Sequence, residues 1–484
     1  MNGDPPEMKA SIFALIYCMA LPLAAQTPPL STPPSPSTTV KVDLSNRMGP
    51  MDIRRFSVGQ GGFSSEPLFA EDTTQIRALR PSVIRLFVQD YYDLLPAPGK
   101  YHFSTLDTSV DLILKTGATP LLCLVFKPKV LFPKIDQNLT KPSSWKAWDK
   151  LVYNLVRHYK KRNGGGWYWE VGNEFDLQDG GGTPYHMTPD QYTRFYAHTV
   201  AAIRRADPQA RVGGPALANY KETIIPALLA FCDKNKVPLD FLSWHGYHSN
   251  PQWFRKSIDD IHDQLKKYPS LHPETVIDEW NMNLGQWNID PRFQPAFIAE
   301  TTFQMVQGGL DLACYYQIRD YPLADDQIAK FYPKRDVQSE EIFWDRRPVY
   351  LGLFDYENHV RPSYFVFRML ERLTGERVGV ESKSQTVHGL ATIDKSLGIA
   401  TIMLWNYSDT ATTVDLDVDN MPTSGHVWRY LLDATGPNND DIARLQPQPV
   451  QKLQQGNGHL SFPLKPWGIT LVSLEEKREF SLWH

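Results

Sequence analysis

The stretch Trp167-Tyr-Trp-Glu-Val-Gly-Asn173-Glu174-Phe175-Asp176 is an aromatic run that favours a buried strand, stops at a glycine and then presents an amide beside a carboxylate. A second run of the same kind, Thr275-Val-Ile-Asp-Glu279-Trp280-Asn281, also ends in a carboxylate among aromatic and amide neighbours. Two parallel strands that end in this way can place both carboxylates in one pocket. The fold therefore depends on how such strands are arranged along the rest of the chain.

Strand-like and helix-like segments alternate from residue 53 to residue 378. The alternation predicts a parallel sheet wrapped by helices, and eight units predict closure into a (β/α)₈ TIM barrel. An open doubly wound sheet is the alternative, but no glycine-rich phosphate turn follows the first strand-like run. The eight strand-like runs are 56–62, 83–88, 119–126, 167–174, 210–215, 239–248, 275–281 and 312–318.

The region from residue 379 to residue 484 has a different pattern, with short strands between turn residues and no helical periodicity. This pattern predicts a C-terminal β-sandwich domain. The run Val40–Leu44 alternates like an edge strand but precedes the barrel. We therefore expect residues 40–52 to form an N-terminal strand that pairs with the β domain.

The N-terminus has the features of an export signal. The apolar run Ser11–Ala25 is short and ends in small residues, which is typical of a secretory signal peptide rather than a membrane span. We expect residues 1–25 to be this signal, with translation beginning at Met8. Residues 26–39 are rich in Pro, Ser and Thr and predict an extended linker. The protein is therefore expected to be secreted or periplasmic.

Charge and cysteine content exclude several classes of protein. The 54 acidic and 50 basic residues give a net charge of −4, and no basic stripe predicts a nucleic-acid partner. Only Cys123, Cys232 and Cys314 follow the signal, which does not describe a disulfide scaffold, and no Cys/His spacing suggests zinc. We expect no metal and no cofactor. The 13 Trp residues suit either a large core or surfaces that stack on sugar rings.

Polar residues at the C-terminal ends of barrel strands face the active site. A pair of carboxyl groups across a cleft is what glycosidic-bond cleavage requires, because one protonates the leaving oxygen while the other attacks the anomeric carbon or activates water. Glu174 and Glu279 are the candidates for this catalytic pair. The strand-end residues expected to bind substrate are Arg85, Asn173, His245, Tyr247, Trp280 and Gln317.

The order of these residues resembles the clan of (β/α)₈ retaining glycoside hydrolases in which Asn-Glu ends the fourth strand and a second Glu ends the seventh. Within that clan the chain is most similar to glycoside hydrolase family 39, the β-xylosidase and α-L-iduronidase family. The resemblance spans the barrel, and a following β-sandwich also fits it. The motifs that carry it are Trp169–Glu174, Ser243–Tyr247, Asp278–Asn281, Gly352–Phe354 and Arg361–Phe365.

The resemblance implies that Glu174 is the general acid/base, that Glu279 is the nucleophile, and that Asn173 binds the sugar hydroxyl next to the anomeric carbon. Arg85 and Tyr247 are the donors expected to keep Glu279 ionised. One position departs from the family pattern. The family usually carries His two residues after the second-strand arginine, and Phe87 stands there in this sequence. Specificity for xylose or iduronate therefore does not transfer directly.

Three of the candidates, and also Trp287, have alternative interpretations. Arg85 also suits a structural ion pair. His245 is expected to contact a sugar hydroxyl, although the spacing His245-x-x-His248 would also suit a metal site if a third ligand lay nearby. Trp280 and Trp287 suit either barrel packing or an apolar wall under a sugar ring.

Together these observations predict a secreted, cofactor-free, retaining glycosidase that acts on an oligo- or polysaccharide, most similar to a β-xylosidase or a related exo-glycosidase. Two alternatives remain open at the level of sequence: an endo-acting hydrolase with an open groove, and a relative that binds carbohydrate without turnover. No feature of the sequence predicts the oligomeric state.

Overall fold

The computed structural model describes residues 36–62, 64–177, 184–283, 293–323, 325–344, 351–421, 425–432, 445–449, 451–453 and 456–475. The proposed signal peptide and Trp287 lie outside these residues. Among the helices of the described ranges, none combines the length and the apolar character that a membrane crossing requires.

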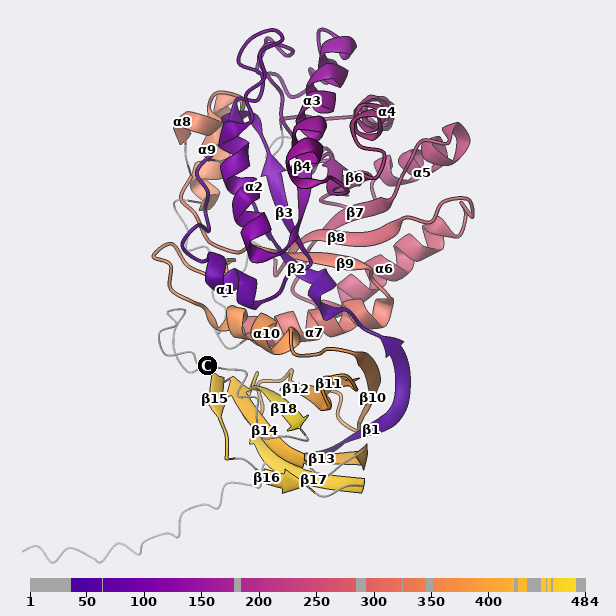
Figure 1. Cartoon of the computed structure of the whole chain (residues 1–484), viewed down its shortest axis with the longest axis vertical. Helices are drawn as coiled ribbons and strands as arrows, with labels where there is room; N and C mark the ends of the chain where they lie inside the picture. The colour runs from indigo at the N-terminus through magenta and orange to yellow at the C-terminus, as the bar shows by residue number, and fades with distance from the viewer. Residues whose placement is uncertain are drawn as a thin grey trace, which may run out of the picture. The chain divides into compact units, whose positions relative to one another are not determined.

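Eight parallel strands close into a barrel in the order β2 to β9, and helices surround it (Figure 1). The predicted barrel class is therefore confirmed. The strands are β2 (Phe56–Gln60), β3 (Val83–Val88), β4 (Thr119–Leu124), β5 (Tyr168–Val171), β6 (Arg211–Leu217), β7 (Phe241–Tyr247), β8 (Glu274–Asn281) and β9 (Leu312–Tyr316). The helices that follow them are α1 (Thr73–Ala78), α2 (Ser104–Thr116), α3 (Trp145–Asn163), α4 (Pro189–Ala206), α5 (Ile224–Asn235), α6 (Pro251–Leu265), α7 (Phe293–Gly308) and α10 (Pro362–Leu370).

Local sequence signals set both ends of α3, the helix that precedes the stretch Trp167–Asp176. Ser144 caps the N-terminus of α3 by accepting a hydrogen bond from the backbone of Ala147, and Gly164 ends the helix in a left-handed conformation. The apolar face of the helix, which includes Trp148 and Tyr159, is buried. The helix thus returns the chain to the barrel at the start of β5.

The interior of the barrel is filled at one end and polar at the other. A compact cluster of inward-facing side chains closes the end where the strands begin. The polar residues predicted from the sequence lie at the other end, which we call the mouth. The cluster comprises Val83, Leu121, Tyr168, Phe241, Val276, Leu312 and Cys314.

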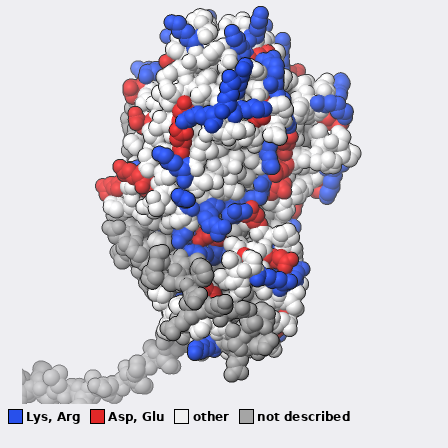
Figure 2. All heavy atoms as spheres, viewed as in Figure 1, with Lys and Arg blue, Asp and Glu red and all other residues white. Residues whose placement is uncertain are grey.

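The outer surface of the helices carries mixed charge. Figure 2 shows Lys and Arg side chains interspersed with Asp and Glu on the face that it presents. Between neighbouring helices they form ion pairs, as where Arg162 of α3 meets Asp107 and Asp111 of α2 at 3.3 and 2.7 Å.

The second sheet has ten strands and is largely antiparallel. Residues from strands near both ends of its order, such as Val427 of β14 and Phe462 of β17, share one buried core, so the sheet folds over itself. Its strands are β1 (Ser37–Pro50), β10 (Glu376–Ser382), β11 (Val387–Asp394), β12 (Ile399–Asn406), β13 (Thr412–Met421), β14 (Gly425–Leu432), β15 (Leu445–Pro447), β16 (Gln451–Leu453), β17 (Gly456–Leu464) and β18 (Ile469–Glu475).

Strand β1 lies between β10, to which it is antiparallel, and β13, to which it is parallel. It starts at Ser37, three residues earlier than the sequence pattern indicated, because Ser37 to Thr39 pair with β13 despite their linker-like composition. Likewise β10 begins at Glu376, just before the expected domain boundary. Backbone pairing sets these limits, and composition alone does not report it.

Because Val42 of β1 is fully buried and its neighbour Lys41 is exposed, the two positions form a matched pair. Val42→Ala is expected to lower the free energy of unfolding by about 1–3 kcal/mol through the lost methyl groups and the cavity. Lys41→Ala on the same strand is expected to change it by less than about 0.5 kcal/mol. Chemical denaturation measures both, and equal effects would contradict the placement of β1 in the β domain.

Candidate active site

Glu174 reaches the mouth through a tight turn after β5. Gly172 has a φ of +113°, and a Cβ there would lie 3.0 Å from the carbonyl oxygen of Pro215, so the turn favours glycine. Glu174 itself has a φ of +51°, and its backbone N–H donates to the carbonyl of Ala216 at 2.8 Å. The neighbouring strand β6 therefore fixes the backbone of Glu174.

Glu279 enters the mouth from β8, next to a β-bulge. Trp244 of β7 pairs with Ile277, but the next residue, His245, pairs with Glu279. Asp278 is thus an extra residue in β8, and the bulge changes the direction of the side chains around it.

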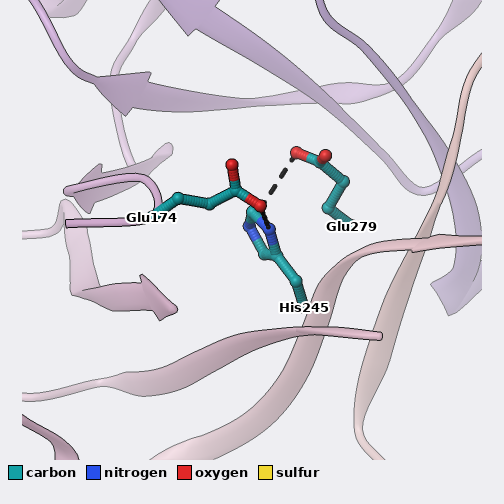
Figure 3. A group of neighbouring side chains, drawn as sticks. All are labelled: Glu174, His245 and Glu279. Atoms are coloured by element: carbon teal, nitrogen blue, oxygen red, sulfur yellow. Dashed lines mark hydrogen bonds and ion pairs between the residues drawn. The ribbon is translucent and has the colours of Figure 1, made fainter. Parts of the chain in front are cut away.

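Glu174, His245 and Glu279 converge in the mouth (Figure 3). One oxygen of each carboxyl group and one ring nitrogen lie within 4.8 Å of one another. His245 Nδ1 is 3.0 Å from Glu174 Oε1, and His245 Nε2 is 3.8 Å from Glu279 Oε2. The side chains of Glu174 and Glu279 are 15% and 8% exposed, so a substrate can reach both.

The two oxygens of Glu279 have separate donors. Arg85 Nη1 donates to Oε2 at 2.8 Å, and the Tyr247 hydroxyl donates to Oε1 at 2.5 Å. Arg85 Nη2 also donates to Asn173 Oδ1 at 2.7 Å. Arg85 therefore connects Glu279 to the Asn173 amide, which adjoins Glu174. The ion pair between Arg85 and Glu279 thus belongs to the active site.

Burial raises the pKa of Glu279 above that of an ordinary glutamate, and the charge of Glu174 adds to this, whereas His245, Arg85 and Tyr247 act in the opposite direction. Arg85 and Tyr247, the donors expected from the sequence, are present, but burial has the larger effect on the pKa of Glu279. For His245, burial lowers the pKa, but the negative charges of Glu279 and Asp278 outweigh it and bring the pKa well above the ordinary value.

Three of the sequence-based expectations need correction. Trp280 is 1% exposed and packs against Phe254 of α6, Phe297 of α7 and Tyr315, so it fills the space outside the barrel and forms no wall under a sugar. Its direction follows from strand alternation, since Glu279 points inward.

Gln317 is fully buried, and its amide contacts the Gln60 amide at 3.4 Å and the Asp320 carboxylate at 3.2 Å. It therefore holds the strand ends together and does not face substrate. His245 is likewise fully buried, and both of its ring nitrogens face carboxylates, which replaces the expected contact with a sugar hydroxyl.

The suggested metal pair does not form one site. The ring of His248 stacks on Trp253 at 5.4 Å with an interplanar angle of 5°, away from the carboxylates that His245 contacts. Glu174, His245 and Glu279 are close enough to share an ion. The raised pKa of His245, however, favours the imidazolium, which has no lone pair for a metal.

Sequence reasoning missed two residues of the site, Glu170 of β5 and Asp278 of β8. They are 0% and 1% exposed and lie beside Arg85. The available signal was their position, because each stands within an apolar strand where an ionisable residue needs a buried partner. Phe87 also contacts Arg85, whose guanidinium carbon lies 4.8 Å from the ring centroid.

A long segment between β9 and α10 borders the mouth. It contains the short helix α8 (Asp325–Ile328) and α9 (Lys334–Trp344). Phe331 lies with its ring centroid 6.3 Å from that of Tyr91, which follows β3. Burial, with the negative charges of Glu340, Glu174 and Asp90 adding to it, raises the pKa of Tyr332 well above its ordinary value.

The fold and the site define a class: a (β/α)₈ barrel whose fourth strand leads to an Asn-Glu pair and whose seventh strand carries a second glutamate. The family model for glycosyl hydrolases family 39 matches residues 95–420, which is more than half of the chain. The chain belongs to this family.

Two curated relatives are similar to this chain, and both are described as beta-xylosidases. The one from Caldicellulosiruptor saccharolyticus is 29% identical over 319 residues, covering 60% of this chain and 61% of the relative. The one from Geobacillus stearothermophilus is 29% identical over 191 residues, covering 37% and 36%. The chain thus spans less than two thirds of the length of either relative.

Solved structures share the fold. A family 39 enzyme from Xanthomonas axonopodis pv. citri matches with a TM-score of 0.71 at 20% identity, over 94% of this chain and all of the other. A monomeric beta-xylosidase from Caulobacter crescentus matches with a TM-score of 0.71 at 18% identity, over 91% and 100%.

Tyr247→Phe removes one donor to the Glu279 carboxylate and is expected to raise the pKa of Glu279 further, because the ionised form loses a hydrogen bond. Carboxyl ¹³C NMR titration measures the shift. Tyr220→Phe is the matched control, since Tyr220 also donates to a carboxylate, that of Asp260 at 2.9 Å, on the outside of the barrel. An unchanged or lower pKa of Glu279 in Tyr247→Phe would contradict the assignment.

Proposed function

We propose that this protein is a retaining glycosidase in which Glu174 is the general acid/base and Glu279 is the nucleophile. The observation that carries the proposal is the approach of one oxygen of Glu174 to one of Glu279 within 4.8 Å. Retaining enzymes hold their carboxyl groups about 5–5.5 Å apart, whereas inverting enzymes keep about 6.5–9.5 Å to admit a water. The short separation supports direct attack by a carboxylate.

In the first half of the reaction, a Glu279 oxygen forms a bond to the anomeric carbon while the bond to the leaving oxygen breaks. Glu174 gives its proton to that oxygen. In the second half, Glu174 takes a proton from water as the water oxygen attacks the anomeric carbon and Glu279 departs. Two inversions at one carbon give net retention.

Arg85 and Tyr247 orient the nucleophile. They hold its two oxygens separately, so the carboxylate plane is fixed before substrate binds. Because Arg85 donates to Asn173 Oδ1, the Asn173 amide is oriented with Nδ2 as the donor for the hydroxyl next to the anomeric carbon.

The proposed substrate class is a β-linked pentoside, above all a β-xyloside. The similarity to two beta-xylosidases supports it. Phe87 limits how far the similarity extends, because an aromatic ring against Arg85 offers a sugar an apolar contact where the family has a histidine. Related β-glucosides, β-galactosides and α-L-arabinosides therefore belong in the same assay.

Two further parts of the proposal concern access and location. The segment with α8 and α9 borders the mouth on the side of Tyr91 and Glu174, which supports a pocket that accepts a chain end rather than an open groove. The apolar run Ser11–Ala25 supports export from the cytoplasm.

Glu279→Ala is expected to lower kcat/KM on an aryl β-xyloside by on the order of 10³-fold or more, because no covalent intermediate can form. Glu174→Ala is expected to spare substrates with good leaving groups, which need little protonation, and to gain activity with azide. Stopped assays on aryl glycosides with leaving groups of different pKa measure both.

Proton NMR of the first-formed sugar in the same reaction is expected to show the anomer of the substrate. Full turnover by Glu279→Ala, or a product of inverted configuration, would refute the two-glutamate scheme.

The raised pKa of Glu279 predicts the acid limit of activity. Glu279 must be ionised to attack, so kcat/KM is expected to fall with decreasing pH through a value above about 4.3, the ordinary pKa of glutamate. A pH profile of kcat/KM under subsaturating substrate measures it. An acid limb at or below about 4 would show that the donors outweigh burial.

A further inference from the structure

Below Glu174 and Glu279 lies a second pair of carboxyl groups, Glu170 of β5 and Asp278 of β8. Both side chains are fully buried. Both contact the same guanidinium, since Arg85 Nε donates to Glu170 Oε2 at 2.7 Å and Arg85 Nη2 lies 2.9 Å from Asp278 Oδ2. The site therefore contains four carboxyl groups in two layers.

The β-bulge in β8 creates this arrangement. Consecutive residues of a regular strand point to opposite faces, so Asp278 and Glu279 would not meet the same partner. With Asp278 as the extra residue, both carboxylates reach Arg85, at 2.9 and 2.8 Å. A bulge beside a reactive carboxylate is a common means of redirecting a side chain.

Asp278 has a second cationic neighbour in His245. His245 Nε2 lies 3.4 Å from Asp278 Oδ2 and 3.8 Å from Glu279 Oε2, and Nδ1 lies 3.0 Å from Glu174 Oε1. Asp278, His245 and Glu174 thus form a continuous row from the interior of the barrel to the mouth. Asp278 has no contact with the mouth itself, because its side chain is fully buried.

The charges of the site do not balance if all four carboxyl groups are ionised, because Arg85 and His245 are the cations that face them. The other titratable groups near the lower pair are Cys123 of β4, Cys314 of β9 and Tyr192 of α4. Burial raises the pKa of all three above ordinary values, so they remain neutral. A buried excess of negative charge is costly, and a proton on some carboxyl groups relieves it.

Glu170 and Asp278 differ in how readily they take up a proton. Burial raises the pKa of Glu170 to about 7, against the effect of Arg85. Burial acts on Asp278 as well, but Arg85 and His245 together hold the pKa of Asp278 below its ordinary value. Of two adjacent carboxyl groups, Glu170 therefore takes up a proton first as the pH falls, and Asp278 keeps its charge.

We propose that Asp278 is a positioning residue whose negative charge keeps His245 in the imidazolium form, with Nδ1–H directed at Glu174. This inference rests on the proposed role of Glu174 as the acid. When Glu174 gives up its proton, its new negative charge faces a cation, which stabilises the first half of the reaction. Below about pH 7, Glu170 supports Arg85 as a neutral hydrogen-bonding partner and does not supply this charge.

The test compares two isosteric substitutions, Asp278→Asn and Glu170→Gln. Both replace a buried carboxyl group beside Arg85 by an amide, but only the first removes a charge. The His245 ring, observed by ¹H–¹⁵N NMR of the full chain, is expected to lose about one to three pH units of pKa in Asp278→Asn, as for loss of an adjacent opposite charge. In Glu170→Gln the pKa is expected to move by less than about 0.5 unit.

The kinetic readout is the alkaline limb of kcat/KM on an aryl β-xyloside with a poor leaving group. Asp278→Asn is expected to move this limb to lower pH together with the pKa of His245, and to lower kcat/KM roughly tenfold or more, since a neutral His245 no longer stabilises the negative charge that develops on Glu174. Glu170→Gln is expected to leave the alkaline limb in place, because an amide resembles the protonated acid and removes no charge beside His245. A residue that only supports the fold would leave the limb in place.

Equal effects of the two substitutions, or an unmoved His245 pKa in Asp278→Asn, would overturn the inference. If Asp278→Asn does not fold, the titration of His245 in the unaltered protein decides, because a pKa at or below the ordinary value of about 6.5 would also overturn it. Absence of turnover by the unaltered protein would refute the proposed glycosidase instead, and the NMR comparison would still test the charge of Asp278.

Discussion

The site depends on one buried cation, the guanidinium of Arg85. It is 3% exposed and contacts Glu170, Asp278 and Glu279 at 2.7 to 2.9 Å. Arginine suits this role because its planar group offers five donors and stays charged when buried. Carboxylates brought together without such a partner would repel one another in a low dielectric, and breaking a buried pair typically costs about 3–5 kcal/mol. Glu170, Asp278 and Glu279 are arranged around this one cation.

The barrel supplies the geometry that the cation requires. Arg85 and Glu279 are 194 residues apart in the sequence, yet parallel strands bring their ends to one edge. Two local irregularities then set the final directions of the side chains. The turn at Gly172 raises Glu174 above the sheet, and the bulge at Asp278 turns two consecutive carboxylates toward Arg85. A regular barrel would place fewer acidic groups in the same volume.

The sequence predicted the barrel, the β domain and the convergence of Glu174, Glu279, Arg85 and Tyr247, because strand periodicity and strand-end chemistry are local signals. It did not predict the role of Asp278. A bulge changes the side-chain alternation by one residue, and that change depends on pairing with β7, which local patterns do not report. His245 was found, but its partners were not, since burial among three carboxylates is a property of the assembled fold.

The segment that holds α8 and α9 has a consequence for how such a protein diversifies. It enters and leaves the barrel between β9 and α10, so it belongs to a single connection and contributes no strand. The part from Asp325 to Trp344 can therefore change in length and sequence without altering the register of the barrel or the contacts of Arg85, whereas Gln317 at the start of the connection holds the strand ends. In this architecture the shape of the active-site entrance and the chemistry of the barrel interior can therefore evolve separately.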